Sequence, residues 1–225
     1  AAHVFHELGA DVVAIGNQPD GLNINQECGA TYPKALQDAV RQQRADLGIA
    51  LDGDGDRLLM ADSAGKTYDG DQLLYIIARH RKQQGTLKGG VVGTLMTNLG
   101  MQRGLEKIKV PFARAAVGDR YVLELMHSRG WHLGGENSGH IICLDKHTTG
   151  DGIVSALQVL HALRAYRTDM AHLTRELVLY PQVLVNVKVA KGFNFRNQRP
   201  VRNALSEAEA DLGDKGRVLL RASGT

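Results

Sequence analysis

Two spacings of apolar residues alternate along the chain. Segments with an apolar residue at every third or fourth position predict helices. The first of these ends at Gly9, and the others span residues 34–43, 69–83, 98–107, 119–128 and 151–166. Short apolar runs predict buried strands at residues 11–15, 47–51, 58–61, 91–95, 112–117, 131–133 and 140–144. Repeated strand–helix alternation favours an α/β fold with mixed, mainly parallel sheets and flanking helices.

The pattern changes after Pro181. Four valines, from Val183 to Val189, alternate with other residues, which is typical of a half-exposed strand in an antiparallel sheet. A helix over 201–212 and a strand over 217–220 follow, so this part reads as the start of an α+β domain. A turn-like stretch at 63–66 marks an earlier boundary. We therefore expect three units, at residues 1–65, 66–180 and 181–225.

Charge and composition exclude several classes of protein. The chain has 27 Lys and Arg against 24 Asp and Glu, and the basic residues are scattered, which argues against nucleic acid or a membrane as a partner. No apolar run approaches the roughly 18 residues of a membrane span. Two cysteines, Cys28 and Cys143, are too few for a disulfide framework and favour the cytoplasm.

Both ends of the chain read as cut. The first helix begins without a capping residue, and the chain stops directly after a strand-like run. We therefore expect an interior piece of a longer protein.

The strongest chemical signal is DGDGDR, residues 52–57, set between two apolar strands. Asp52, Asp54 and Asp56 stand at alternate positions, and the glycines between them allow a backbone tight enough for three carboxylates to converge on one hard cation. The alternative is an acidic surface turn. Three carboxylates that leave room for a phosphate oxygen fit Mg²⁺ better than a complete Ca²⁺ cage.

Polar loops give two weaker signals. Residues 134–140 gather Glu136, Asn137, Ser138 and His140, which can bind sugar hydroxyls and offer a proton-transfer group, although a plain polar hairpin has the same composition. At the end of the chain, RASGT combines a guanidinium with hydroxyls and is a candidate phosphate cradle. Two helix starts, at 118–120 and 148–152, resemble ligand contacts more weakly.

Taken together, DGDGDR, GENSGH and RASGT, in this order and spacing, resemble the α-D-phosphohexomutase superfamily. The longer runs GTLMTNLG (93–100), RAAVGDRYV (114–122) and GENSGHIICLDKHTTGDGI (135–153) are most similar to its bacterial phosphoglucosamine mutase branch. That resemblance implies four domains around one cleft. Residues 1–65 would be the later part of domain two, 66–180 domain three and 181–225 the start of domain four. The family's catalytic phosphoserine lies in domain one, to which nothing here corresponds.

The resemblance also implies a reaction and a role for each loop. Glucosamine 6-phosphate and glucosamine 1-phosphate would interconvert through the phosphoserine and a 1,6-bisphosphate, for UDP-N-acetylglucosamine and cell-wall synthesis. Mg²⁺ would sit on the three aspartates, with Arg57 beside the phosphoserine and His140 assisting proton transfer. The substrate, a small amino-sugar phosphate, would contact residues Arg120, Glu136, Asn137, Ser138, Arg221, Ser223, Gly224 and Thr225.

Two other readings stay open. A phosphomannomutase/phosphoglucomutase shares all three loops, but we expect Met in that branch where Asn137 stands here. A truncated chain could also bind Mg²⁺ or sugar phosphate without turnover. Because the phosphoserine domain is absent, we expect these 225 residues alone to be inactive. The resemblance leaves room for a homodimer.

Overall fold

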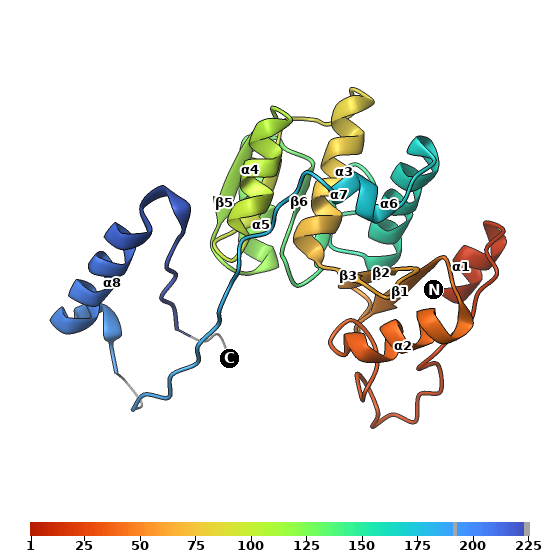
Figure 1. Cartoon of the computed structure of the whole chain (residues 1–225), viewed down its shortest axis with the longest axis horizontal. Coiled ribbons are helices and arrows are strands. Elements are labelled where there is room, and N and C mark those ends of the chain that lie inside the picture. The colour runs from red at the N-terminus through yellow and green to blue at the C-terminus, as the bar shows by residue number, and fades with distance from the viewer. Residues whose placement is uncertain (191–192, 223–225) are drawn as a thin grey trace.

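A computed structural model describes residues 1–190 and 193–222 of the chain. Figure 1 shows α1, α2 and β1 to β3 at one end of the molecule and α8 at the other, with the remaining elements between them. The helices are α1 (Ala2–Glu7), α2 (Pro33–Gln43), α3 (Gly70–Gln83), α4 (Leu99–Lys107), α5 (Asp119–Arg129), α6 (Gly152–Tyr166), α7 (Met170–Thr174) and α8 (Arg199–Leu212), with 3-10 turns η1 (Phe195–Asn197) and η2 (Gly213–Lys215). The strands are β1 (Leu47–Leu51), β2 (Leu58–Asp62), β3 (Thr67–Tyr68), β4 (Val91–Thr94), β5 (Phe112–Ala115), β6 (Leu133–Gly135) and β7 (Ile141–Cys143).

The first sheet is an antiparallel meander in the order β1-β2-β3. Its strands alternate in the direction their side chains face. Ala50 and Ala61 pack under α2 against Leu36 and Val40. Met60 belongs instead to the main core on the other face. The sheet therefore lies between α2 and the rest of the molecule, and the loop between β1 and β2 is exposed at its edge.

The second sheet has the order β5-β4-β6-β7 and lies between two layers of helices. Strand β4 pairs in parallel with β5 and with β6, while β7 runs antiparallel to β6. Val92 and Ile142 face α5 on one side. Val91 and Ile141 face the main core around α3 on the other. The result is a three-layer α/β/α unit.

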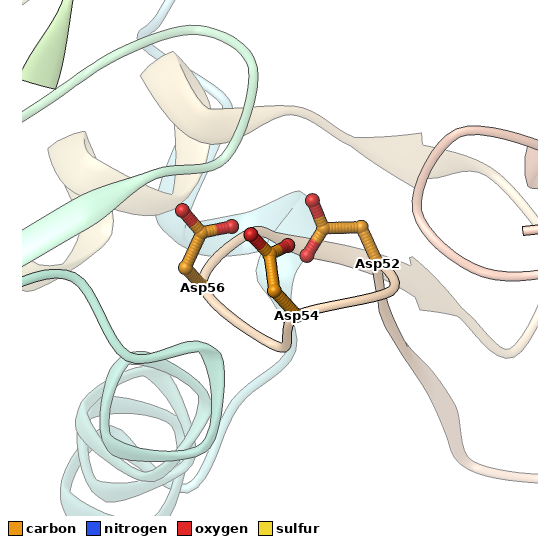
Figure 2. A group of neighbouring side chains, drawn as sticks. All are labelled: Asp52, Asp54 and Asp56. Carbon is orange, nitrogen blue, oxygen red and sulfur yellow. The ribbon is translucent and has the colours of Figure 1, made fainter. Parts of the chain in front are cut away.

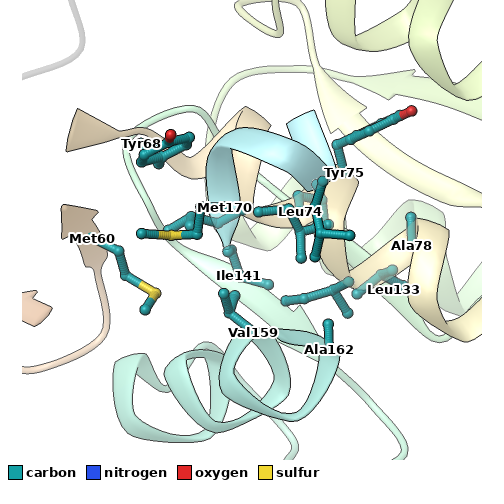
Figure 3. Close-up of a cluster of buried hydrophobic side chains, with 14 of the residues drawn as sticks. Met60, Tyr68, Leu74, Tyr75, Ala78, Leu133, Ile141, Val159, Ala162 and Met170 are labelled. Carbon is teal, nitrogen blue, oxygen red and sulfur yellow. The ribbon is translucent and has the colours of Figure 1, made fainter. Parts of the chain in front are cut away.

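The main core surrounds α3, which is buried on almost every side. Leu73, Leu74 and Ile76 of this helix are fully buried, and Figure 3 shows Leu74 in one cluster with side chains of the first sheet and of helix α6. Met60 and Tyr68 reach this core from the first sheet, and Val159 reaches it from α6. The core therefore joins the two sheets into one packed body and fixes the loops at their edges.

The predicted α/β class is confirmed, with mixed sheets and flanking helices. Each predicted helix is present within a few residues. The parallel character is narrower than expected, because the only parallel pairs among the described residues lie in the second sheet. None of the described helices combines the length and the apolar character that a membrane span requires.

Three predicted strands are wrong. Residues 11–15, 183–189 and 217–220 are extended or irregular chain. Val183, Val185 and Val187 are at least 73% exposed, so the alternating pattern faces solvent on both sides. A strand needs a neighbour to bond its N–H and C=O groups. No described residue pairs with these three segments, which explains why the patterns do not produce strands here.

Candidate metal and sugar-phosphate site

The loop that joins β1 to β2 holds the three aspartates of the predicted metal site. One carboxylate oxygen from each of Asp52, Asp54 and Asp56 lies within 4.8 Å of the other two, and Figure 2 shows the three side chains on the same side of the loop. Gly55 has a φ of +75°, and its N–H donates to the Asp52 carbonyl. The backbone N–H of Arg57 donates to the Asp52 carboxylate at 3.1 Å and closes the loop. The local chain thus brings alternate residues to one point.

This loop is electrostatically suited to a cation. Burial raises the pKa of Asp56 above its ordinary value, and the charges of Asp52 and Asp54 add to that shift, although the His140 ring opposes it. Asp56 Oδ1 is buried and has no hydrogen-bond partner among the described residues, which is unfavourable for a carboxylate unless a positive group reaches it. Mg²⁺ is held by carboxylate oxygens and keeps further positions for water or phosphate oxygens, and the three aspartates offer such oxygens within 4.8 Å of one another. The residues therefore fit Mg²⁺.

Residues 134–140, which we call the sugar loop, form the turn of the β6–β7 hairpin together with the adjoining ends of its strands. Inside the turn, the N–H of Glu136 donates to the His140 carbonyl. Two backbone-to-backbone bonds fasten the turn to neighbouring elements: Leu58 N–H donates to the Gly139 carbonyl, and Gly70 N–H donates to the Asn137 carbonyl. Leu58 opens β2 and directly follows the metal loop. The hairpin turn and the metal loop are therefore held side by side.

The side chains of the sugar loop differ in their surroundings. Glu136 Oε1 accepts a bond of 3.0 Å from the backbone N–H of Gly118, so this carboxylate links the hairpin to the start of α5. Asn137 is half-buried and Ser138 is exposed. Ser138 is thus free to meet a ligand, whereas Glu136 already serves as a tether.

His140 is buried beside the metal loop. Its side chain is 5% exposed, and Nε2 lies 3.4 Å from Asp56 Oδ2. The backbones of His140 and Arg57 form an isolated β-bridge. Arg57 itself is half-exposed, with Nε 3.7 Å from the Asp52 carboxylate. The two residues expected to assist the chemistry therefore flank the aspartates, one buried and one open to solvent.

The loop at 148–152 contacts both His140 and the metal loop, which its sequence indicated only weakly. A Cβ on Gly150 would clash with His140 Nε2, so the glycine backbone lies against the imidazole. The N–H of Gly152 donates to the Gly55 carbonyl in the metal loop, and the Asp151 side chain caps α6. The two glycines around Asp151 were the available signal, because glycine permits this close backbone approach.

The remaining predicted substrate contacts lie outside this cluster or outside the described residues. Arg120 pairs with Glu124 at 2.8 Å on the exposed surface of α5. Arg221 is exposed, and its guanidinium donates to the Ala222 carbonyl. Ser223, Gly224 and Thr225 fall outside the described residues. The structure thus joins the metal loop to the sugar loop, and it does not bring Arg120 or Arg221 to them.

Two family models match the chain. A phosphoglucomutase/phosphomannomutase α/β/α domain III model covers residues 69–180. A model of the phosphoglucomutase/phosphomannomutase C-terminal domain covers residues 184–225. Together they account for most of the chain.

Curated relatives match over the whole chain. The phosphoglucosamine mutase of Nitrosospira multiformis is 64% identical over 225 residues, and that of Thiobacillus denitrificans is 63% identical over the same length. The chain spans about half the length of these relatives, 49% in each case.

Solved structures share the fold. An N-acetylphosphoglucosamine mutase of Aspergillus fumigatus, in complex with GlcNAc-6P and magnesium, matches with a TM-score of 0.70 at 24% identity, over 89% of this chain and 48% of that one. A phosphoglucomutase/phosphomannomutase family protein of Burkholderia thailandensis matches with a TM-score of 0.67 at 23% identity, over 81% of this chain and 40% of that one.

Proposed function

The chain belongs to the phosphoglucomutase/phosphomannomutase family, and on that premise we propose that it is part of a phosphoglucosamine mutase. The whole protein would act in the cytoplasm, where it would interconvert glucosamine 6-phosphate and glucosamine 1-phosphate. This reaction would supply UDP-N-acetylglucosamine for cell-wall synthesis. A phosphoserine outside this chain would give its phosphoryl group to the sugar 6-phosphate. The resulting 1,6-bisphosphate would reorient in the site, and its other phosphoryl group would then be transferred to the serine.

One observation carries this proposal. Three aspartates converge within 4.8 Å, and the strand that follows them is hydrogen-bonded to a sugar-loop hairpin. Phosphoryl transfer depends mainly on positioning and on neutralising charge around the moving group. Mg²⁺ on Asp52, Asp54 and Asp56 supplies positive charge at that position when it is bound. A metal loop fastened to a sugar loop matches these two needs.

The neighbouring residues have distinct roles in this proposal. Arg57, half-exposed beside Asp52, would donate to the phosphoryl oxygens. Ser138 is exposed on the hairpin and would bind a sugar hydroxyl, with Asn137 beside it. Glu136 would bind a hydroxyl with the oxygen that Gly118 does not use. Arg120 would contact the substrate, and Arg221, Ser223, Gly224 and Thr225 would hold the phosphate that does not react.

The unit boundaries follow the same reasoning. We assign residues 1–65 to the later part of domain two, 66–180 to domain three and 181–225 to the start of domain four. The family-model matches begin at residues 69 and 184, close to the two proposed boundaries. The metal loop and the sugar loop then belong to different domains that pack through one core.

The runner-up is a phosphomannomutase/phosphoglucomutase, whose name the matching family models carry. Identity above 60% to phosphoglucosamine mutases over the whole chain favours the amino sugar. Asn137, where we expect Met in the other branch, points the same way.

The proposal is tested by assaying the full-length protein with glucosamine 6-phosphate, Mg²⁺ and a trace of the 1,6-bisphosphate. We expect formation of glucosamine 1-phosphate in proportion to enzyme, and its loss when a chelator removes the metal. No product under these conditions would refute the proposed reaction.

The same assay on the 225-residue chain should give no sustained turnover, because the nucleophile that carries the phosphoryl group is outside it. Turnover by the chain alone would mean that one of its own serines carries the phosphoryl group.

A further inference from the structure

The turn between β4 and α4, residues 94–98, is held in place by two charged side chains of neighbouring elements. Asp71, at the start of α3, is completely buried, and its Oδ2 accepts a bond of 2.7 Å from the Asn98 backbone N–H. Arg114, on β5, donates to two carbonyls of the turn, and one of them, that of Thr97, lies 2.9 Å away. A carbonyl oxygen can accept two bonds, so the Thr97 oxygen has one acceptor site left, in a fixed position.

The chain after Pro181 is fastened to this turn and to the helix that follows it. Near the start of that unit, Gln182 Nε2 donates to the Met96 carbonyl at 3.2 Å. Near its end, Arg217 Nη2 donates to the Thr97 carbonyl at 2.9 Å. A third bond runs from a guanidinium of α4 to a carbonyl of η2. Between the described residues, no other hydrogen bond joins the chain after Pro181 to the chain before it.

Two guanidiniums share the Thr97 carbonyl, and a buried acid lies near both. Arg114 and Arg217 each donate to this oxygen, although like charges at short range repel each other. Burial lowers the pKa of both guanidiniums, and the charge of Asp71 opposes that shift in each of them. Asp71 thus offsets the repulsion between the two arginines and favours the position of Arg217 on the turn.

Arg217 also stands close in sequence to the proposed phosphate residues. The run from Arg217 to Arg221 is neither helix nor strand. A fully extended chain spans at most about 3.6 Å per residue, so the Cα atoms of Arg217 and Arg221 lie within about 14 Å of each other. A fastened Arg217 therefore limits where Arg221 and the residues after it can stand.

We propose that Arg217 is a positioning residue, whose bond to the Thr97 carbonyl fastens the run 217–221 to the turn at 94–98 and so places the phosphate-binding residues. The inference rests on the proposed function in taking Arg221 as one of those residues. Asp71 and Arg114 act one step further away, because they fix the turn. Loss of the Arg217 bond should therefore weaken binding of the sugar phosphate more than it slows the transfer step.

Three variants of the full-length protein separate this role from a general effect of charge. Arg217→Met removes the guanidinium and keeps much of the aliphatic length. Arg217→Lys keeps the charge and a donor on a shorter side chain, so it should restore part of the bond. Arg202→Met makes the same change at an exposed position of α8 and is the control.

The first measurement is amide hydrogen exchange without ligand, which reports local opening of the chain. A hydrogen bond from a charged donor is strong enough that its loss changes an equilibrium by about 10-fold or more. We expect peptides that cover residues 217–222 to exchange about 10-fold faster in Arg217→Met, and at an intermediate rate in Arg217→Lys. Peptides from α3 should be unchanged in both, and Arg202→Met should match the wild type throughout.

The second measurement is the Kd for glucosamine 6-phosphate by titration calorimetry, with a chelator present so that no turnover occurs. We expect Arg217→Met to bind about 10-fold more weakly than the wild type, and Arg217→Lys to recover part of this loss. In the mutase assay at saturating substrate, kcat of Arg217→Met should stay within about threefold of the wild type, since a lost ground-state contact raises KM rather than lowering kcat.

The outcomes separate the inference from the proposed function. Exchange and Kd equal to the wild type in Arg217→Met would overturn the inference and leave the proposed function standing. Faster exchange with an unchanged Kd would also overturn it, because the bond would then not position the phosphate. The expected changes, in a protein that binds glucosamine 6-phosphate without converting it, would support the inference and refute the proposed function. No binding of this ligand by the wild type would overturn both.

Discussion

At the scale of single residues, Asp54 is the aspartate of the metal loop that contributes least to holding the loop together. Its side chain is exposed, and no hydrogen bond or ion pair ties it to another described residue. Asp52, by contrast, is bonded to the backbone N–H of Arg57, and Asp56 contacts His140. Asp54 is therefore the position at which a loss of metal binding is best separated from a loss of fold.

We expect Asp54→Ala in the full-length protein to reduce kcat/KM by about three orders of magnitude or more, since charge stabilisation by a metal contributes several kcal/mol. The thermal midpoint in the absence of metal should be almost unchanged, because exposed substitutions usually shift stability by about 0.5 kcal/mol or less. Asp38→Ala, which removes an exposed partner of Lys34 on α2, is the control. Near-normal turnover in Mg²⁺ by Asp54→Ala would show that the metal assignment is wrong.

Asp71 is a second informative residue, well away from sequence motifs. Its side chain is completely buried at the start of α3. Burial raises its pKa to about 7, although its bond from the Asn98 backbone N–H lowers the pKa and thus opposes that shift. The native state therefore keeps a proton that the unfolded chain loses near about pH 4.

The sign of the effect follows from proton binding. Between about pH 4 and about pH 7 the native state binds more protons than the unfolded state, so Asp71 makes stability fall as pH rises. Asp71→Asn keeps an acceptor for Asn98 and removes the charge. We expect the unfolding free energy of Asp71→Asn minus that of the wild type to increase by roughly 3 kcal/mol from about pH 5 to about pH 8. Urea unfolding at each pH measures this difference. A constant difference across this range would contradict the raised pKa.

The residue-level site was predictable where the signal lies within one short segment. Alternate aspartates and glycines are enough to predict convergence of Asp52, Asp54 and Asp56. The burial of His140 was not predictable, because the atoms that cover it come from Gly150 and Asp56, on separate loops. The same holds for Arg120, whose neighbour one helical turn later, Glu124, engages it on the helix surface.

At the scale of secondary structure, strands formed where the chain also provides a partner. The runs at 47–51 and 58–61 became β1 and β2 because each bonds to the other. The run at 183–189 has an equally clear pattern but no partner among the described residues, so it stays extended and exposed. Periodicity describes the faces of a strand and cannot supply its neighbour.

The antiparallel pairing in the first sheet could have been predicted from the length of the connection between its strands. Parallel strands need a crossover of about a dozen residues or more, and the loop at 52–57 is much shorter. The parallel pairs β4–β5 and β4–β6 each have a helix between them in sequence. Connection lengths therefore carried the information that the apolar runs lacked.

Gly139 tests how tightly the hairpin is fastened to β2. Its φ is +100°, and a Cβ there would clash with the Leu58 carbonyl oxygen. Gly139→Ala therefore combines left-handed backbone strain with a backbone clash, and we expect it to destabilise the protein by about 2–5 kcal/mol.

The control is Gly85→Ala, where φ is +70° but nothing lies within 4 Å of the place that the new methyl group would take. It should cost only about 1 kcal/mol. Urea unfolding of both variants measures the difference. Equal destabilisation would mean that the contact between the hairpin and β2 is loose.

At the scale of the whole molecule, one core holds together two sheets whose edge loops carry the residues of the proposed metal and sugar sites. Tyr68 and Met60 from the first sheet pack in the same cluster as Val159 and Ile141 of the second unit. Residues after Pro181 are held differently: Gln182 and Arg217 donate to the carbonyls of Met96 and Thr97, and α8 has no buried residue. The metal loop and the sugar loop thus flank one shared core, to which none of the described residues after Pro181 contributes.

This arrangement makes sugar recognition the most direct test of the central claim, because the hairpin next to the metal loop would read the sugar itself. The measurement compares kcat/KM of the full-length protein for glucosamine 6-phosphate, glucose 6-phosphate and mannose 6-phosphate in Mg²⁺, since the ratio of these values is the specificity. We predict a clear preference for glucosamine 6-phosphate. A preference for mannose 6-phosphate or glucose 6-phosphate would contradict the account and assign the chain to a phosphomannomutase/phosphoglucomutase.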